Sequence, residues 1–328
     1  MKILYVDLQY DYGIKERGKN IIGLDGFKSS FEGLGHDVTM FYYDEYLYNT
    51  EPMQQKLKEF ADDINPDLIF FSLFQNQFEL ETLDYLKSKY TTVNWFGDDQ
   101  WRFDDFTSKY VNYFTYCITT DKFSIPKYKK LGQQNVIYSQ WAAINSHEIP
   151  NFDGYKYDVS FVGGFHPYRK WFINTLKKRG INIEAFGNGW ENGLLSAEEM
   201  NKLFISSKIN LNIGNSNSFD VRYLLSYWKA VPLLFRSKKN ASQIKARNFE
   251  IPYFGGFQLT DYAPTVEDYF NIGKEIVCYK DVDEAELIIR YYLENEEERI
   301  SITKASHIKA IEEHGYINRL KNVLEQIK

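Results

Sequence analysis

Short apolar runs alternate with segments of helical periodicity along the first part of the chain. Apolar residues recur at helical spacing between positions 23 and 34, and Gly35 follows as a natural helix stop. Two more helices are predicted at Met53–Asp62 and Leu80–Lys89. The strands predicted around these helices are Ile3–Leu8, Val38–Tyr42, Asp67–Ser72, Thr91–Phe96, Tyr116–Thr119 and Val136–Tyr138. Strands this apolar are typical of a parallel sheet covered on both faces, so the pattern predicts a doubly wound α/β domain.

A second alternation follows a polar, turn-rich stretch at 145–157, which contains Pro150, Asp153 and Gly154. Helices are predicted there at Tyr168–Arg179 and Asp283–Leu293, with one long terminal helix from about Thr303 to Ile327. The strands predicted in this half are Asp158–Val162, Ile181–Phe186, Lys208–Ile213 and Val231–Phe235.

Two βαβ series in succession predict two Rossmann-like, doubly wound lobes that face a central cleft. The expected domains are residues 1–150, residues 151–302, and a terminal helix at 303–328 that packs back toward the cleft or the first lobe. In such sheets, ligands bind beyond the carboxyl ends of the strands. Candidate site residues are therefore sought in the loops that follow strands.

Composition excludes several classes of protein. In 328 residues, 44% are hydrophobic, 26% are charged and 17% are aromatic, which indicates a globular protein with aromatic side chains available for ligand pockets. Residues 1–150 carry 15 Lys and Arg against 22 Asp and Glu, within a net charge of −6 for the whole chain. An acidic first half argues against a nucleic-acid partner, which would require a basic stripe.

No apolar stretch is long enough for a membrane span, and the early Asp7 argues against a signal peptide. Cys117 and Cys278 lie far apart in apolar runs, which predicts two buried thiols rather than a disulfide or a zinc site. Together these features predict a cytoplasmic protein.

The most informative motif runs from Phe161 to Arg169, where a strand leads into Gly163 and Gly164 and then into a helix. Glycines allow close approach of the backbone, a helix N-terminus presents free N–H groups, and Arg169 adds positive charge. This combination suits a phosphate or diphosphate. An ordinary βα turn with a surface arginine would give the same pattern, and no full dinucleotide fingerprint is present.

Another turn at a strand end is formed by Gly187, Asn188, Gly189 and Trp190. It could line the pocket for a nucleotide base, or it could be a tight turn capped by a core tryptophan.

Arg247 and Glu250, three residues apart, would share a face of a helix that precedes Gly256. Either they form a surface ion pair, or the cation binds phosphate while the carboxylate binds sugar hydroxyls.

In the first half, Asp98 and Asp99 follow a predicted strand and are flanked by Trp95 and Trp101. Acids among aromatic rings suit sugar binding or a general base, and the rings could stack on sugar faces. Aspartates at this position also commonly cap the next helix.

Three further residues are expected to be structural or solvated. His36 lies at a predicted helix-to-strand turn, and His314 and Arg319 lie on the predicted terminal helix.

Taken in order, these segments resemble the CgeB-like (spore-maturation-protein-like) glycosyltransferases of the GT-B fold. The similar segments are 158–169, 186–190, 247–260 and 314–319, together with 34–38 and 94–102 in the first half. The resemblance implies a bacterial-type enzyme that holds a nucleotide-sugar donor in the second lobe and an acceptor against the first. The long segment Asn215–Ser242 departs from the family pattern.

The resemblance also implies roles for individual residues. Glu250 matches the glutamate expected to hold the donor ribose, and Arg169 and Arg247 fall where diphosphate-binding cations are expected. Enzymes of the GT-B type generally need no bound metal, and no D-x-D motif stands in a suitable place. The donor-binding set is completed by Gly163, Gly164, Gly187, Asn188, Gly189, Trp190 and Gly256.

The expected function is therefore transfer of a sugar, most simply a hexosyl group, from a nucleoside-diphosphate sugar to a glycan, protein or small-molecule acceptor. No permanently bound cofactor is expected. Two alternatives remain open at this point: a non-catalytic nucleotide-sugar-binding or regulatory protein, and a sugar-nucleotide epimerase with two similar lobes.

Overall fold

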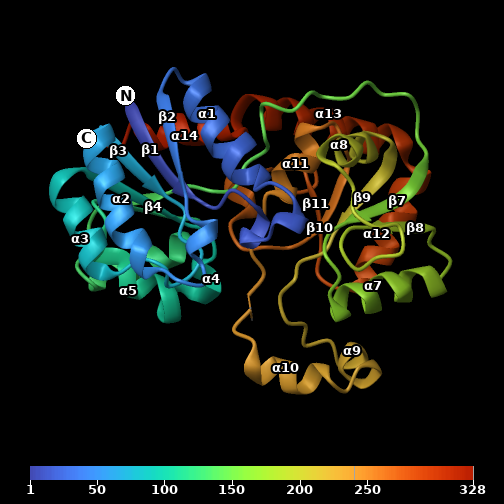
Figure 1. The fold of residues 1–328 in the computed structure, drawn as a ribbon. Helices are drawn as coiled ribbons and strands as arrows, with labels where there is room; N and C mark the ends of the chain where they lie inside the picture. The colour runs from blue at the N-terminus through green and yellow to red at the C-terminus, as the bar shows by residue number, and fades with distance from the viewer. Residues whose placement is uncertain (240, 328) are drawn as a thin grey trace. The chain divides into compact units, whose positions relative to one another are not determined.

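The computed structural model describes residues 1–239 and 241–327, and its contacts divide the chain into two compact units (Figure 1). Unit 1 comprises residues 1–146 together with 316–328, and unit 2 comprises residues 147–315. The chain therefore leaves unit 1 once and returns to it at its C-terminal end.

Unit 1 is built on a sheet of six parallel strands in the order β2-β1-β3-β4-β5-β6. Its strands are β1 (Lys2–Asp7), β2 (Asp37–Tyr42), β3 (Leu68–Phe71), β4 (Thr91–Phe96), β5 (Tyr116–Thr119) and β6 (Val136–Tyr138). The larger helices are α1 (Ser29–Gly33), α2 (Glu51–Ile64), α3 (Leu80–Lys89), α6 (Ile125–Lys130) and α14 (Tyr316–Leu324). A wide turn of π-helix, η3 (Ile22–Lys28), precedes α1.

Short helical segments complete unit 1. They are η1 (Asp11–Gly13), η2 (Lys15–Arg17), η4 (Asp44–Tyr46), α4 (Asp99–Arg102), η5 (Phe103–Thr107), α5 (Ser108–Tyr110), η6 (Val111–Tyr113) and η7 (Lys122–Ser124).

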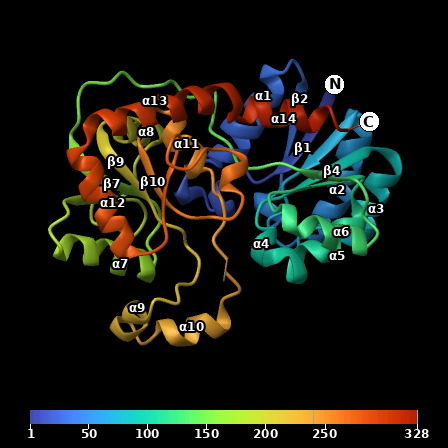
Figure 2. The same ribbon diagram turned by 180° about the vertical axis from the view of Figure 1, so that it is seen from behind.

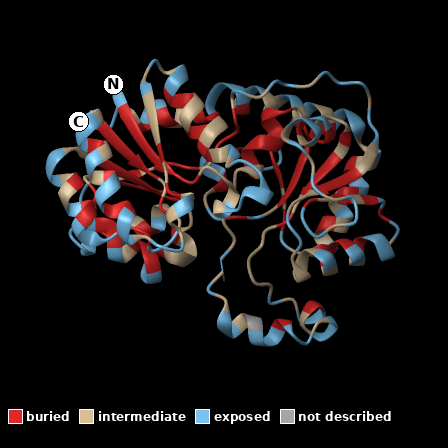
Figure 3. Cartoon of the chain, viewed as in Figure 1, coloured by how far each residue is buried: buried red, intermediate tan, exposed pale blue. Residues whose placement is uncertain are grey.

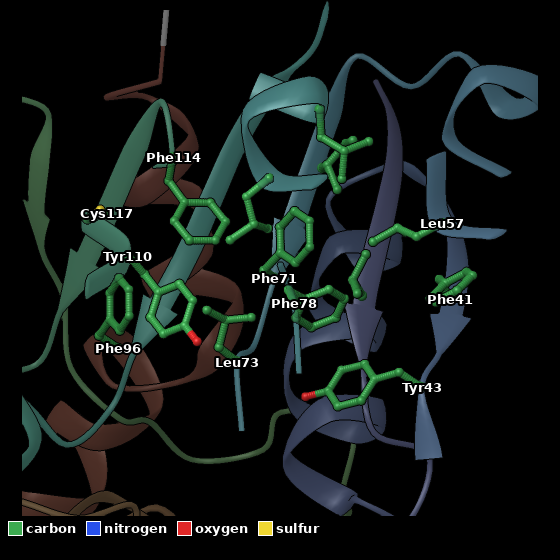
Figure 4. Packing of buried hydrophobic residues seen from close by; sticks show 14 of the residues in the cluster. Phe41, Tyr43, Leu57, Phe71, Leu73, Phe78, Phe96, Tyr110, Phe114 and Cys117 are labelled. Carbon is green, nitrogen blue, oxygen red and sulfur yellow. The ribbon is translucent and has the colours of Figure 1, made fainter. Parts of the chain in front are cut away.

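Alternate residues of the central strands fill two different cores, one on each face of this sheet. Ile69 and Phe71 point into the cluster shown in Figure 4, whereas Leu68 and Phe70 point into the other cluster. Burial on both faces explains why these strands read as nearly unbroken apolar runs. The helix α14 closes the second cluster, where the Tyr316 ring lies 5.0 Å from that of Phe27.

Unit 2 contains five parallel strands in the order β11-β10-β9-β7-β8. The strands are β7 (Tyr157–Val162), β8 (Ile183–Phe186), β9 (Ser207–Asn212), β10 (Gln258–Asp261) and β11 (Val277–Tyr279). The helices are α7 (Pro167–Lys178), α8 (Ala197–Ile205), α9 (Val221–Ser226), α10 (Ala230–Arg236), α11 (Arg247–Tyr253), η8 (Val266–Asp268), α12 (Val282–Glu294) and α13 (Glu296–Glu313). Helices α12 and α13 can be followed in Figure 2, which shows the molecule from the opposite side to Figure 1. Figure 3 shows that the strands of both sheets are mostly buried.

Both sheets place their earliest strand between the next two strands of the unit, so each has a point where the strand order reverses. This point lies between β1 and β3 in unit 1 and between β7 and β9 in unit 2. The prediction of two Rossmann-like, doubly wound units is confirmed. Ligands of such sheets bind beyond the carboxyl ends of the strands at this point.

Two predicted elements are wrong. Residues 231–235 form helix α10 instead of a strand, because Pro232 has no N–H group for a sheet ladder and β10 occupies the place beside β9. The predicted single terminal helix is two helices, which are separated at His314 and Gly315. The helix is interrupted there because the Tyr316 N–H donates to the Ala143 carbonyl, at 3.0 Å, instead of to a carbonyl of the preceding helical turn.

His314 was expected to be solvated, and this is also wrong. Its side chain is buried, packs against Phe249 and Phe270, and has its Nε2 atom 3.0 Å from the Tyr269 carbonyl oxygen. Arg319 is partly buried. Of the two cysteines, Cys117 is buried and Cys278 is partly buried, and burial raises the pKa of both thiols.

Candidate functional site

The candidate phosphate turn lies at the carboxyl end of β7, beside the point where the strand order of unit 2 reverses. Gly163 and Gly164 form this turn, and His166 and Pro167 start α7 directly after it. A side chain at Gly163 would meet the ring of Phe161 at 2.9 Å, so the turn leaves no room there for anything larger than glycine. The turn therefore presents an exposed backbone and a twelve-residue helix N-terminus to the same region.

The second glycine turn packs directly against the first. Gly187 has a φ of +124°, and a Cβ atom there would lie 2.4 Å from the carbonyl oxygen of Gly163. The indole Nε1 of Trp190 donates to that same carbonyl at 2.8 Å. The structure thus brings the two predicted motifs together into one double turn.

Asn188 and Gly189 complete the contact between these turns. The Phe165 N–H donates to the Asn188 carbonyl at 2.8 Å, and a Cβ atom at Gly189 would lie 2.6 Å from the Cβ atom of Phe165. The side chain of Asn188 is exposed. Gly189 is therefore required for packing, while Asn188 has a side chain available to a ligand.

Arg169 ties the double turn to the loop after β9. Its Nε donates to the Ile213 carbonyl at 2.9 Å, and its Nη1 donates to the Gly164 carbonyl at 2.9 Å. Burial lowers the pKa of this guanidinium to about 10, and the nearby Asp261 carboxylate opposes the shift. Arg169 thus stays charged at neutral pH and both shapes the turn and supplies positive charge to it.

Two titratable groups beside this turn were missed by the sequence reasoning. Burial, with the charges of Arg169 and Lys239, lowers the pKa of His166 to about 4. Burial raises the pKa of Asp261 to about 6, although its carboxylate accepts the Gly214 N–H at 3.1 Å. Burial is the main reason that His166 stays neutral, while the smaller contribution of Arg169 and Lys239 reflects positive charge near the turn, which suits an anion. Asp261 was missed because β10, which it ends, was not predicted from its polar sequence.

Arg247 and Glu250 form an ion pair on α11, and the pair is not an exposed one. Glu250 is buried, and its Oε2 lies 2.5 Å from the Arg247 Nη1. The Arg247 guanidinium also lies 5.3 Å from the ring centre of Phe204, and its charge contributes to lowering the pKa of Arg169. The charges of the two arginines therefore act on each other.

Gly256 lies elsewhere in unit 2. It precedes β10, so it is at the amino end of a strand, whereas Gly163 and Gly164 follow the carboxyl end of β7 in the same parallel sheet. A Cβ atom at Gly256 would lie 2.7 Å from the side-chain nitrogen Nδ2 of Asn210. Gly256 therefore has a packing role beside α11, since the same Cβ atom would lie 3.0 Å from Ile251 and from the Phe204 carbonyl oxygen, and it is not part of the double turn.

In unit 1, Asp99 turns into the protein interior. It is 2% exposed and accepts hydrogen bonds from the hydroxyls of Thr107 at 2.7 Å, Thr119 at 2.5 Å and Tyr128 at 2.6 Å. Burial raises its pKa to about 6, while these three donors oppose the rise. These three hydrogen bonds tie the loop after β4 to η5, β5 and α6.

Asp98 is the partly buried member of the pair, and its carbonyl accepts the N–H groups of Trp101 and Arg102 at the start of α4. Trp95, which was expected to offer a ring to a sugar, is only 4% exposed and packs in the core of unit 1. That expectation is wrong for Trp95, because its ring points into the core, where it lies 4.9 Å from the ring of Phe27. Trp101 is partly buried.

Another buried carboxylate, Asp7, ends β1 at the reversal point of unit 1. It accepts hydrogen bonds from the Tyr5 hydroxyl at 2.6 Å and the Leu8 N–H at 2.7 Å, and burial raises its pKa to about 7. A Cβ atom at Gly23 would lie 2.4 Å from its Oδ2. The early acid that argued against a signal peptide is thus a group that titrates near neutrality.

A polar pocket of about 260 Å³ opens on unit 1 beyond β3 and β4. Among the residues that the structure describes, the Arg102 guanidinium makes one hydrogen bond, from Nη2 to the Phe74 carbonyl at 2.9 Å, and it lies 4.0 Å from the ring centre of Phe106. The pocket is lined by Leu47, Thr50, Gln75, Asn76, Gln77, Arg102 and Phe106. Amide, guanidinium and aromatic groups together suit a hydroxylated ligand. Its lining comes from three separate loops, so no sequence motif marks it.

Among the described residues, none of the groups of His, Cys, Asp and Glu is arranged to hold a metal ion. Within the same part of the chain, no helix is long and apolar enough to cross a bilayer.

Comparison with known proteins gives a partial family match. Residues 169–325 match a family model described as "Glycosyl transferase-like", and this range includes Arg169, Arg247 and Glu250. A search of curated proteins found no match.

Solved structures share the fold over the whole chain. HepE from Anabaena, solved in complex with UDP and glucose, is similar at a TM-score of 0.62 and 12% identity, covering 99% of this chain and 98% of its own. The glycosyltransferase AviGT4 of avilamycin A biosynthesis is similar at 0.59 and 10%, covering 100% and 97%. Sucrose-phosphate synthase from Thermosynechococcus elongatus is similar at 0.60 and 8%, covering 99% and 98%. These similarities confirm the GT-B fold.

Proposed function

We propose that the protein is a glycosyltransferase that moves a hexosyl group from a nucleoside-diphosphate sugar to an acceptor hydroxyl. The observation that carries this proposal is the double turn of unit 2 with Arg169 at its centre. Arg169 and the second of its two glycine turns lie within residues 169–325, the range that matches the "Glycosyl transferase-like" family model. The neighbour HepE, which binds UDP and UDP-glucose, supports a uridine donor. We further propose that the protein is CgeB-like, bacterial and cytoplasmic.

The donor diphosphate would bind at the N-terminus of α7, between Arg169 and Arg247. When the bond from the sugar C1 atom to the diphosphate oxygen breaks, negative charge grows on the leaving group. The two guanidinium groups and the helix N-terminus stabilise this charge without a metal ion. Glu250, which pairs with Arg247, would accept hydrogen bonds from ribose hydroxyls.

The acceptor would bind to unit 1, in the pocket that Arg102 and Phe106 line. Its hydroxyl oxygen forms the new bond to the sugar C1 atom and gives its proton to a base. Asp98 is the better candidate for this base, because Asp99 already accepts three hydroxyl donors in the interior.

The test uses the purified protein with UDP-, GDP- and dTDP-sugars and a panel of glycan and small-molecule acceptors. Nucleoside diphosphate released only when an acceptor is present supports a transferase, and activity that survives EDTA supports metal independence. An altered donor sugar would indicate an epimerase, and binding without turnover would indicate a sensor. Either of these results contradicts the proposal.

Site variants locate the donor. Arg247→Ala should weaken UDP binding about tenfold or more, because a charge-assisted hydrogen bond contributes about 1.5–3 kcal/mol. Glu250→Ala should weaken UDP binding but leave the affinity for inorganic diphosphate unchanged or higher, since it frees Arg247. Arg179→Ala is the matched control, because Arg179 is ion-paired to Asp283 at the far end of α7. Equal UDP binding by the parent and the first two variants would show that the donor site is elsewhere.

A further inference from the structure

Residues 215–239, here called the arm, leave the sheet of unit 2 after β9 and carry helices α9 and α10 (Figures 1 and 2). The two ends of the arm are joined by hydrogen bonds from the Asn217 N–H to the Lys239 carbonyl, at 2.7 Å, and from the Asn217 Nδ2 to the Ser237 carbonyl, at 3.2 Å. The arm is therefore a closed excursion from the Rossmann-like core, and it coincides with the segment that departs from the family pattern.

One side of α9 is anchored to the core of unit 2. Tyr223 is 3% exposed, and its ring lies 5.3 Å from that of Tyr168 and 5.8 Å from that of Trp171, both on α7. Arg222 pairs with Asp283 of α12 at 2.7 Å. These contacts fix which side of α9 faces outward.

The outward side is apolar. Val221 and Leu225 lie four residues apart on α9 and are 65% and 82% exposed, and Trp228, in the turn between α9 and α10, is 72% exposed. Phe235 on α10 is 86% exposed, and Figure 3 shows the arm largely exposed. Single exposed apolar side chains are common on protein surfaces, but several large ones gathered on one small protrusion mark an interaction surface.

The arm is basic. Residues 215–239 contain five Lys and Arg against one acid, Asp220, within a chain whose net charge is −6. Lys229 and Arg236 are exposed and alternate along the chain with Trp228 and Phe235. Exposed Trp, Phe and Leu beside Lys and Arg are characteristic of segments that lie in the interface of a bilayer, where cations meet anionic headgroups.

We propose that the arm binds the protein to the surface of an anionic lipid bilayer. Leu225, Trp228 and Phe235 would enter the boundary between headgroups and acyl chains, while Lys229 and Arg236 would pair with lipid phosphates. A second copy of the chain is a poorer occupant, since two basic arms would repel each other. An acidic protein groove would need a shape to match side chains spread over two short helices, whereas a fluid bilayer needs none. This inference does not depend on the proposed enzymatic activity.

The experiment is co-sedimentation of the protein with two kinds of vesicle, one of phosphatidylcholine alone and one of phosphatidylcholine mixed with anionic phosphatidylglycerol. We expect binding to the anionic vesicles only, weakened by added salt. The triple variant Leu225→Ser, Trp228→Ser and Phe235→Ser should bind at least tenfold more weakly. The pair Lys229→Glu and Arg236→Glu should remove the preference for anionic lipid.

The matched control changes three apolar side chains elsewhere on unit 2 that are 71%, 69% and 57% exposed: Leu194→Ser, Leu287→Ser and Ile308→Ser. It should bind vesicles like the parent. Brominated lipid should quench tryptophan fluorescence in the parent and less in Trp228→Phe, which reports insertion even if the triple variant folds poorly. Equal binding to both kinds of vesicle, or vesicle binding by a folded triple variant that equals the parent's, would overturn the proposal. Self-association lost only in the triple variant would also overturn it, by identifying a second copy as the occupant.

Discussion

Replacing Asp99 would separate a buried positioning carboxylate from a catalytic one. Three hydroxyls donate to it, and each hydrogen bond to a charged acceptor contributes about 1.5–3 kcal/mol. Burial opposes this gain, because it raises the pKa from 3.8 to about 6, a difference of roughly 3 kcal/mol. Asp99→Ala removes both contributions and leaves three buried hydroxyls without their acceptor. We therefore expect a net loss of about 2–5 kcal/mol in the stability of unit 1.

The pH dependence gives a sharper test. Because the folded pKa of Asp99 lies above its unfolded value, its stabilising contribution is full below about pH 4 and is lost as the pH rises through about 6. Asp99→Asn does not titrate, and its amide oxygen still accepts hydroxyl donors. The change in stability between about pH 4 and pH 7 should therefore be smaller in this variant than in the parent by up to about 3 kcal/mol.

Urea unfolding followed by circular dichroism at several pH values measures these differences. Hydrogen exchange of peptides from β4 and β5 assigns them to unit 1. Asp98→Asn, which changes the partly buried neighbour, is the control and should keep the parent's pH profile. An Asp99→Asn profile parallel to that of the parent would refute the reasoning. The reasoning would also be refuted if Asp99→Ala kept the stability of the parent but lost its turnover.

Three further predictions concern unit 2. Gly187→Ala should destabilise unit 2 by about 2–4 kcal/mol in urea unfolding, since its Cβ atom would lie 2.4 Å from the Gly163 carbonyl oxygen at a φ of +124°. The control is Gly180→Ala, at a φ of +87° but with open space around it, which should cost only about 1 kcal/mol. Equal losses of stability in the two variants would contradict the packing argument. The pKa of His166, lowered to about 4 in the free protein, should rise when UDP is added, because the diphosphate offsets the neighbouring cations; an NMR titration that shows no change would place the diphosphate elsewhere. Arg169→Lys should weaken UDP binding at least tenfold and lower the melting temperature, as a lysine cannot bridge the two carbonyls; a variant that matches the parent in both would remove Arg169 from the site.

The sequence predicts the α/β pattern well where burial alone decides it. Strand β3 reads as an apolar run because helices cover both faces of its sheet. Residues 231–235 are equally apolar, but a run this short does not distinguish a strand from a helix. Strand β10 escapes prediction for the opposite reason, since Gln258, Thr260 and Asp261 are polar and their partners come from distant segments.

The candidate site shows the same division. The glycine turns can be found from the sequence because close backbone approach needs glycine wherever it occurs. Which carboxylate of an adjacent pair turns inward cannot be found in this way. The answer for Asp99 depends on Thr119 and Tyr128, which lie 20 and 29 residues further along the chain. Arg169 likewise owes its position to a carbonyl 44 residues away.

The return of the chain to unit 1 at Tyr316 has a consequence for biosynthesis. Tyr316, Leu320 and Val323 are almost fully buried in one of the two cores of unit 1, so that core is incomplete until residues 316–323 have left the ribosome. Residues 147–315 of unit 2 are all synthesised before these residues. The usual order, in which the N-terminal domain folds first, is thus reversed. Unit 2 can complete its fold while the η3–α1 side of unit 1 is still uncovered, and unit 1 completes its fold only afterwards.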